Sequence, residues 1–188
     1  MRCVNSLLER LQCRRVNAVY SIVVCADSCS PPLAPNGLRW AWIHHESALR
    51  GLPVTNSAIR TFTRLAARGS VGIGLLSSRE CVARAWMSTP HARLPAHLPA
   101  WLGRNYWIHS CRTNEAFRGQ GLYTSAVRYL LAHAAAQSAP ASVEVFIDTT
   151  PNNEPSKRAI QRAGFEYRGT IVTYRLPKTG LSFARWIK

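Results

Sequence analysis

The stretch that most constrains the fold is a glycine-containing turn, Arg118 to Tyr123, which lies between an extended segment and a helical one. The residues before it, Tyr106 to Thr113, are rich in aromatic and β-branched types and predict a strand. The residues after it place apolar side chains at helical spacing: Leu122, Ala126, Leu130 and Ala134. A helix that begins at such a turn exposes backbone N–H groups, which bind anions and especially phosphates. Gly119 and Gly121 allow a ligand to approach the backbone closely, so the segment predicts a phosphate-binding turn.

Two well-known classes of phosphate loop do not fit this turn. The chain contains no GxxxxGK[ST] motif, and the GxGxxG pattern is incomplete because Thr124 stands in its last position. Nucleotide hydrolysis and dinucleotide redox chemistry are therefore disfavoured. An isolated G-x-G before a helix is most often a plain helix start, so the turn needs a second feature to indicate a ligand.

A second strand and helix downstream supply that feature. Val143 to Asp148 alternates apolar with acidic or aromatic residues, which predicts a strand. A short helix follows and extends to Ala163, with Asn153 or Glu154 at its start and Pro155 in its first turn. Gly164 ends this helix, and residues 165–174 predict a further strand.

Together the two segments resemble the GNAT acyltransferase superfamily. Its acyl-CoA signature, [QR]-x-x-G-x-[GA], is matched by Arg118 and Gly121, with Tyr123 in place of the final small residue. Its N-x-x-[SA] segment is matched at Asn153 and Ser156, followed by Gly164 and Phe165. The resemblance covers residues 70–175 well and residues 1–69 loosely. It implies an α/β fold with a mixed, mostly antiparallel central sheet, helices on both faces and a splayed pair of parallel strands.

The resemblance also implies a cofactor, acetyl-CoA or another acyl-CoA, bound between strands 106–113 and 143–148. The pyrophosphate is expected on the backbone of residues 118–124, and the pantetheine arm beside residues 111 and 113. The residues implied in cofactor binding are Cys111, Thr113, Arg118, Gly119, Gln120, Gly121, Leu122, Tyr123, Thr124, Asn153 and Ser156. The acceptor implied is an amine, carried by a small molecule or a peptide.

Direct attack of an amine on a thioester needs a group that takes the proton of the amine. The candidates are Glu115, His109 and Glu144, and for the first two a solvated loop acid and a structural histidine are the commoner roles. Cys111 as an acyl-carrying nucleophile ranks lowest, because no base is assigned to it. The tyrosine that many family members use as general acid is replaced by Ile160, so that role is vacant or filled elsewhere.

The remaining chain has a simpler pattern. Residues 1–15 predict a basic amphipathic helix, 16–26 and 38–43 strands, and 45–49 and 57–68 helices. Residues 70–76 and 81–88 predict a hairpin, with a bulge where Gly72 and Gly74 interrupt the first strand. A proline-rich loop, 89–104, is long enough to cover a binding site. Residues that could face a substrate are His44, His45, His91, His97 and Trp101.

Length and composition set the outer bounds. The 188 residues predict a single domain, 1–188, and no run approaches the ~18 apolar residues of a membrane-spanning helix. The six cysteines show no metal-ligand spacing, so we expect no metal and free thiols in the cytoplasm. The net charge of +15 indicates an anionic partner. Two alternatives stay open: a catalytically degenerate acyl-CoA-binding regulator, and a basic RNA-binding or RNA-modifying protein. A homodimer is compatible with the family, although no interface is recognisable.

Overall fold

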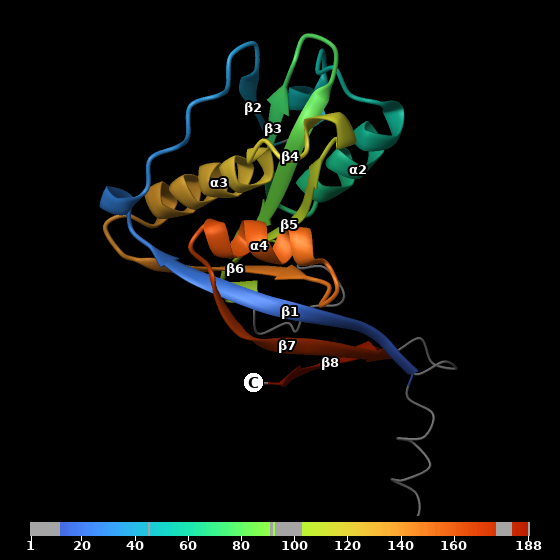
Figure 1. Ribbon diagram of the computed structural model, residues 1–188, viewed down its shortest axis with the longest axis vertical. Helices are drawn as coiled ribbons and strands as arrows, with labels where there is room; N and C mark the ends of the chain where they lie inside the picture. The colour runs from blue at the N-terminus through green and yellow to red at the C-terminus, as the bar shows by residue number, and fades with distance from the viewer. Residues whose placement is uncertain (1–11, 45, 91, 93–102, 176–181, 188) are drawn as a thin grey trace, which may run out of the picture.

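The computed structural model describes residues 12–44, 46–90, 92, 103–175 and 182–187, and it contains one sheet of eight strands (Figure 1). The order of strands across the sheet is β2-β3-β4-β5-β6-β1-β7-β8. The strands are β1 (Gln12–Val24), β2 (Arg39–Ile43), β3 (Ser70–Leu76), β4 (Cys81–Ser88), β5 (Tyr106–Thr113), β6 (Val143–Thr149), β7 (Glu166–Arg175) and β8 (Ser182–Ile187). All neighbours pair antiparallel except β5 and β6, which are parallel. The expected fold class is thereby confirmed.

In the described part of the chain, three α-helices cover the two faces of this sheet: α2 (Asn56–Ala66), α3 (Leu122–Ser138) and α4 (Glu154–Arg162). Alternation along β4 separates the faces, because Trp86 packs with Phe62 of α2 while Ala85 and Met87 pack with the core beneath α3. Short 3₁₀ turns occupy Ala26–Ser28, Glu46–Leu49 and Glu115–Phe117. None of the helices in the described ranges is long and apolar enough to cross a membrane.

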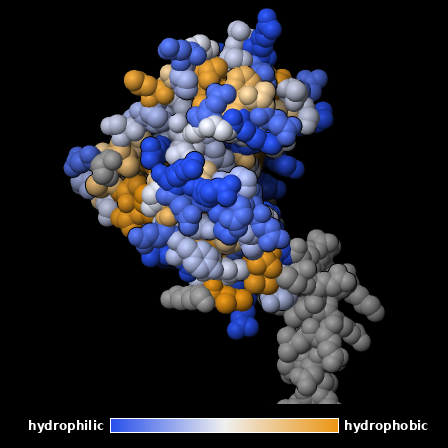
Figure 2. Space-filling model, in the orientation of Figure 1, coloured by the Kyte–Doolittle hydropathy of each residue, from blue (hydrophilic) through white to orange (hydrophobic). Residues whose placement is uncertain are grey.

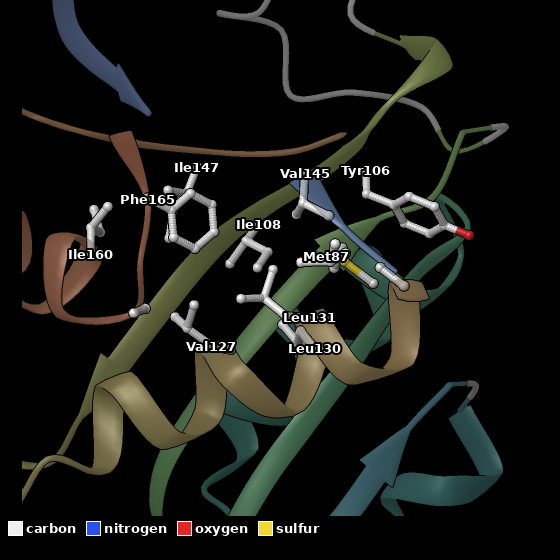
Figure 3. Close-up of a cluster of buried hydrophobic side chains, with 14 of the residues drawn as sticks. Met87, Tyr106, Ile108, Val127, Leu130, Leu131, Val145, Ile147, Ile160 and Phe165 are labelled. Atoms are coloured by element: carbon white, nitrogen blue, oxygen red, sulfur yellow. The ribbon is translucent and has the colours of Figure 1, made fainter. Parts of the chain in front are cut away.

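The main core lies between the sheet and the helices α3 and α4 (Figure 3). Leu130 and Leu131 of α3 point toward Met87, Ile108 and Val145 of the central strands (Figure 3). Ile160 of α4 lies beside Phe165 and Ile147 in the same cluster. These contacts fix the starts of α3 and α4 close to the end of β5.

The parallel pair separates part of the way along. β5 and β6 pair only from Tyr106–Val145 to Ile108–Ile147, whereas β5 stays paired with β4 as far as Thr113. The register between β4 and β5 shifts in this region, and Ser110 takes a left-handed backbone with φ of 53°. This irregularity is a β-bulge, which bends β5 away from β6 and leaves one edge of its last residues unpaired with β6. The splayed pair implied by the resemblance is present.

The structure confirms most of the predicted elements and corrects a few. The hairpin 70–76/81–88 and strand 106–113 have the predicted bounds. The helix expected over 1–15 is wrong at its end, because residues 12–15 belong to β1 and pair with β7; residues 1–11 lie outside the described residues. The bulge expected at Gly72 and Gly74 lies instead at Leu75 and Leu76. Strand β8 was not predicted, and His45, His91, His97 and Trp101 lie outside the described residues.

Candidate active site

A groove of about 630 Å³ lies where the end of β5, the turn before α3 and the first half of α4 meet. Of the residues predicted to bind the cofactor, all except Gln120 line this groove. The wall from β5 consists of residues 111–113, which follow the bulge. The two sequence motifs, although far apart along the chain, therefore form opposite walls of one cavity.

The turn before α3 leaves the helix N-terminus open to this groove. Gly121 is the N-cap of α3 with φ of 73°, and Gly119 has φ of 81°, a left-handed region that favours glycine. Gly121 offers no side chain to cap the first turn. A Cβ atom at either glycine would meet no other atom within 4 Å, so there is space for a ligand beside the backbone. The amide of Arg118 donates to the carbonyl oxygen of Glu115, so the open donors are those further along the turn.

Four arginines surround the groove. Arg112 and Arg118 lie on the β5 side, and Arg158 and Arg162 are one helical turn apart on α4. Arg118 Nη1 lies 2.9 Å from Glu115 Oε1, and both side chains are mostly exposed. The surface over α4 and the adjoining part of α3 is accordingly hydrophilic (Figure 2). The cationic walls and the positive end of the α3 dipole act together to favour a polyanion.

The start of α4 is held by its own side chains. Asn153 Oδ1 accepts a hydrogen bond from the amide of Ser156 at 3.3 Å, which makes Asn153 the N-cap. Lys157 Nζ donates to the carbonyl oxygen of Pro151 and lies 2.6 Å from Glu154 Oε1. Thr124 Oγ1 donates across to the carbonyl oxygen of Ala159 at 3.4 Å and joins α3 to α4. The predicted residues Asn153 and Thr124 therefore shape the groove walls.

Tyr123 closes the inner end of the groove. Its hydroxyl lies near Cys111 of β5 and Ser156 of α4, which stand on the two walls. Burial raises the pKa of Tyr123, and the neighbouring Cys111 adds to the rise. Burial likewise raises the pKa of the Cys111 thiol to about 12. Both groups therefore stay protonated at neutral pH, which argues against Cys111 as a nucleophile.

One buried atom of the groove wall has no hydrogen-bond partner among the described residues. Thr113 Oγ1 is buried, and no described residue hydrogen-bonds to it. Thr113 lines the groove at the end of the unpaired β5 edge. A buried hydroxyl without a partner is costly, and a ligand with amide groups would satisfy it.

The opposite face of the sheet carries the polar groups nearest the split between β5 and β6. His109 is buried and lies 3.0 Å from Ser88 Oγ through Nε2 and 3.0 Å from Ser110 Oγ through Nδ1. Asp148, the residue of β6 just beyond its last pair with β5, accepts hydrogen bonds from Trp107 Nε1 at 2.7 Å and from Asn17 Nδ2. The charge of Asp148 contributes to the raised pKa values of Cys111 and Tyr123. Asp148 therefore acts electrostatically on the inner end of the groove.

The structure does not bring the other two candidate bases to this point. Glu115 is exposed at the outer rim and paired with Arg118. Glu144 lies near the start of β6, away from the split, and accepts a hydrogen bond from Ser21 Oγ at 2.6 Å. Ile160 is fully buried in the main core (Figure 3).

Sequence reasoning missed three residues of this site. Arg158 and Arg162 are four residues apart on a predicted helix, and this spacing, which places them on one face, is the sequence signal that identifies them. Asp148 ends the predicted strand 143–148, and its position became meaningful only with the register of β5 and β6.

Comparisons with solved structures agree with this architecture. A GCN5-related N-acetyltransferase from Kribbella flavida matches with 16% identity and a TM-score of 0.53, over 90% of this chain and 61% of that one. An acetyltransferase of the GNAT family from Colwellia psychrerythraea matches with 15% identity and a TM-score of 0.53, over 92% of this chain and 60% of that one. A tandem GNAT protein of the clavulanic acid biosynthesis pathway matches with 11% identity and a TM-score of 0.54, over 98% of this chain and 58% of that one. The chain thus spans less than two thirds of the length of these proteins, and at such identities the likeness concerns the fold.

No curated protein is similar enough to this sequence to match it. A model of the Acetyltransferase (GNAT) family matches residues 62–165, more than half of the chain. This match spans the β3–β4 hairpin, the turn before α3 and the whole of α4. The chain belongs to the acetyltransferase (GNAT) family.

Proposed function

We propose that the protein is an acyl-CoA-dependent N-acyltransferase, which moves an acetyl or similar acyl group from coenzyme A to an amine. The observation that carries the proposal is the groove at the split of β5 and β6, with an uncapped helix N-terminus and four arginines around it. Helix amides and guanidinium groups are the donors that suit phosphates. A cytoplasmic location, a single domain, a homodimer and an RNA partner stay predictions.

The groove walls fit the successive parts of an acyl-CoA. Arg118, Arg158 and Arg162 suit the phosphates, together with the amides after Gly119. The unpaired edge of β5 beside Cys111 offers backbone groups to the amides of a pantetheine arm, as an added strand would. Thr113 Oγ1, which no described residue hydrogen-bonds, supports the same path. Bound there, the acyl-CoA would supply an activated thioester.

The chain's own groups suggest how the reaction is assisted. Asp148 is the described carboxylate nearest the split and would accept the proton of the attacking amine. Tyr123 would donate a hydrogen bond to the sulfur as the carbon–sulfur bond breaks, since its raised pKa keeps the hydroxyl protonated. Backbone N–H groups of the bulged part of β5 would stabilise the charge on the carbonyl oxygen. His109 stays a second candidate base, which would act through Ser110.

The experiment that tests this proposal is calorimetric titration of acetyl-CoA into the wild type and into Arg158→Gln, Gly121→Glu and Arg68→Gln. Arg158→Gln removes one groove charge and is expected to weaken binding about tenfold. Gly121→Glu places a negative charge in the open space before α3 and is expected to abolish binding. Arg68 is exposed and does not line this groove, so Arg68→Gln controls for net charge. Circular dichroism checks the folding of each variant, because Gly121 has a positive φ.

Release of free thiol with a panel of primary amines then separates an enzyme from a binding protein. Turnover that falls at least about a hundredfold in Asp148→Asn, with acetyl-CoA affinity unchanged, supports the role given to Asp148. Tight binding of acetyl-CoA, with no release of free thiol in the presence of any amine, favours the regulatory alternative. Absence of acetyl-CoA binding by folded wild type contradicts the proposal altogether.

A further inference from the structure

A second pocket lies on the α2 face of the sheet, on the other side of β5 from the acyl-CoA groove. Its volume is about 330 Å³, and it is lined by the start of α2, the turn between β3 and β4, the start of β4 and the end of β5. Arg112 is the residue that lines both cavities. The two cavities therefore approach the same stretch of the splayed strand from opposite sides.

Two arginines in this pocket are direct neighbours. Arg84 of β4 and Arg112 of β5 are cross-strand partners, which places their side chains next to each other on one face. Like charges directly opposite on neighbouring strands are destabilising. The effect is visible in the pKa of Arg84, which is lowered first by burial and further by the charge of Arg112. Within the described residues, neither guanidinium forms an ion pair or a hydrogen bond.

The arrangement of Arg84 is fixed by packing. The guanidinium carbon lies 5.0 Å from the centre of the Phe62 ring, and Phe62 is fully buried. The charge is therefore held half-buried at the pocket wall and cannot move freely into solvent. Arg84 is thus held beside the exposed Arg112 with no counter-ion among the described residues, which is the arrangement of a preformed anion site.

The rest of the lining agrees with an anionic ligand. The pocket reaches the N-terminus of α2, whose N-cap Thr55 accepts a hydrogen bond from the amide of Ala58 at 3.3 Å. The positive end of this helix dipole adds to the arginine charges. Glu80 is the one carboxylate among the lining residues, and Asn114 Nδ2 donates a hydrogen bond to it. The described lining thus carries two guanidinium groups and one carboxylate, an excess of one positive charge. One acidic group of a ligand would neutralise this charge.

We propose that Arg84 and Arg112 bind one oxyanion group, a carboxylate or a phosphate, in the pocket beneath α2. If the protein is the acyltransferase proposed above, the oxyanion belongs to the amine acceptor. The acid group is then held on the α2 face while the amine reaches the thioester at the split of β5 and β6. This deepens the proposed function, since it assigns the acceptor to amines that carry an acid group.

Thermal unfolding in different anions tests the site without acetyl-CoA. Wild type, Arg84→Met, Arg112→Gln and the double variant are unfolded in sodium chloride, in sodium phosphate and in sodium acetate at equal ionic strength. Arg84→Met keeps the side-chain stem over Phe62 and removes the charge, and Arg68→Gln is the matched control. Arg84 does not line the acyl-CoA groove, so phosphate bound there affects wild type and Arg84→Met alike.

We expect phosphate, acetate or both to raise the Tm of wild type and Arg68→Gln more than that of the three pocket variants. The lost stabilisation corresponds to an affinity at least about tenfold weaker for each single variant, because each removes charge-assisted hydrogen bonds. A gain in phosphate alone indicates a phosphate-bearing ligand, and a gain in acetate alone a carboxylate. Equal gains in wild type and Arg84→Met, including no gain in either, overturn the site.

Arg112 is exposed, so Arg112→Gln should fold even where Arg84→Met does not. Because Arg112 also lines the acyl-CoA groove, its effect is compared with that of Arg158→Gln, which removes a charge from that groove alone. The results also distinguish failure of the proposed acyltransferase function from failure of the proposed oxyanion site. If acetyl-CoA does not bind while the anion effect depends on Arg84, the pocket stands and only its assignment to an acceptor falls.

Discussion

At the scale of single residues, the unusual feature of this protein is that two thiols beside its cavities are kept neutral by burial. Cys111 and Cys81 both have raised pKa values, about 12 and about 11, with burial as the main cause. Cys81 is itself buried at the start of β4 and lines the second pocket. The region between the two cavities therefore disfavours negative charge unless arginines accompany it.

These thiols give a testable dependence of stability on pH. The unfolded chain releases each thiol proton near pH 9.0, whereas the folded protein keeps it up to about pH 11 for Cys81 and about pH 12 for Cys111. Above pH 9 the folded state thus binds more protons than the unfolded state, so the free energy of unfolding falls as the pH rises. Between its pKa in the unfolded chain and its pKa in the folded protein, each thiol contributes a slope of about 1.4 kcal/mol per pH unit. Its contribution to the free energy of unfolding is fully present below pH 9 and is lost as the pH rises above that value.

Urea unfolding between pH 8 and 10.5 measures this slope. Cys111→Ala is expected to remove about half of the part due to the two thiols, although it lowers stability at every pH by leaving a cavity. Ile147→Val, a buried change without a titratable group, should shift the whole curve and leave its slope unchanged. An unaltered slope in Cys111→Ala would show that this thiol ionises in the folded protein as it does in the unfolded chain.

A second residue-scale prediction concerns Gly72 of β3. A Cβ atom at this position would lie 2.7 Å from the ring of Trp86, which is fully buried between β4 and α2. Gly72→Ala is therefore expected to lower the free energy of unfolding by about 1–3 kcal/mol through overpacking. At Gly74 the nearest atom is 3.4 Å away, so Gly74→Ala should cost less. Chemical denaturation of both variants tests the difference, and equal losses would contradict it.

At the scale of elements, the sequence predicted those helices and strands whose limits depend on neighbouring residues. The hairpin of β3 and β4 was predicted with its bounds because apolar strands flank a polar turn, and Ser77 caps that turn in the structure. The start of α3 followed from two glycines. Pairing between distant segments could not be predicted from local pattern. Gln12 lies in β1 because it pairs with Arg175, although the local sequence has a helical pattern. Strand β8 forms because it pairs with β7 at the edge of the sheet.

The same division applies to the candidate site. Asn153 and Gly121 were identified because capping and helix starts depend on neighbouring residues. The pairing of Arg84 with Arg112, and the location of Asp148 at the split, depend on the register of three strands. A sequence without that register offers no reason to select these residues from the other charged positions.

The cap of α4 gives a prediction for a whole element. Asn153→Ala removes the acceptor for the Ser156 amide and is expected to lower the free energy of unfolding by about 1 kcal/mol. Because Ser156 and Arg158 line the groove, loosening this turn should also weaken acetyl-CoA binding if the proposed function holds. Thr55→Ala, which removes the cap of α2, should cost similar stability and leave acetyl-CoA affinity unchanged. Calorimetry on both variants distinguishes a local effect on the groove from a general loss of stability.

At the scale of the whole molecule, the sheet divides the positive charge between two cavities. In Figure 1 the strands β2 to β5 turn sharply against β6, β1, β7 and β8. The two cavities lie on opposite sides of β5. Arginines line both, and Arg112 is shared. Part of the net charge of +15 is therefore gathered around the two cavities, and the rest is spread over the chain.

The excess of basic over acidic residues along the whole chain predicts how salt affects stability. With 24 basic and 9 acidic residues the folded chain repels itself, and this repulsion is greatest at low ionic strength. Raising sodium chloride from about 10 mM to about 150 mM shortens the screening length from roughly 30 Å to 8 Å, so the Tm should rise. Arg68→Glu, a charge reversal at an exposed position outside both cavities, should raise the Tm in low salt and lose that advantage in high salt. A Tm that falls steadily as salt is added, in wild type and variant alike, would mean that the ion pairs of the fold outweigh its self-repulsion.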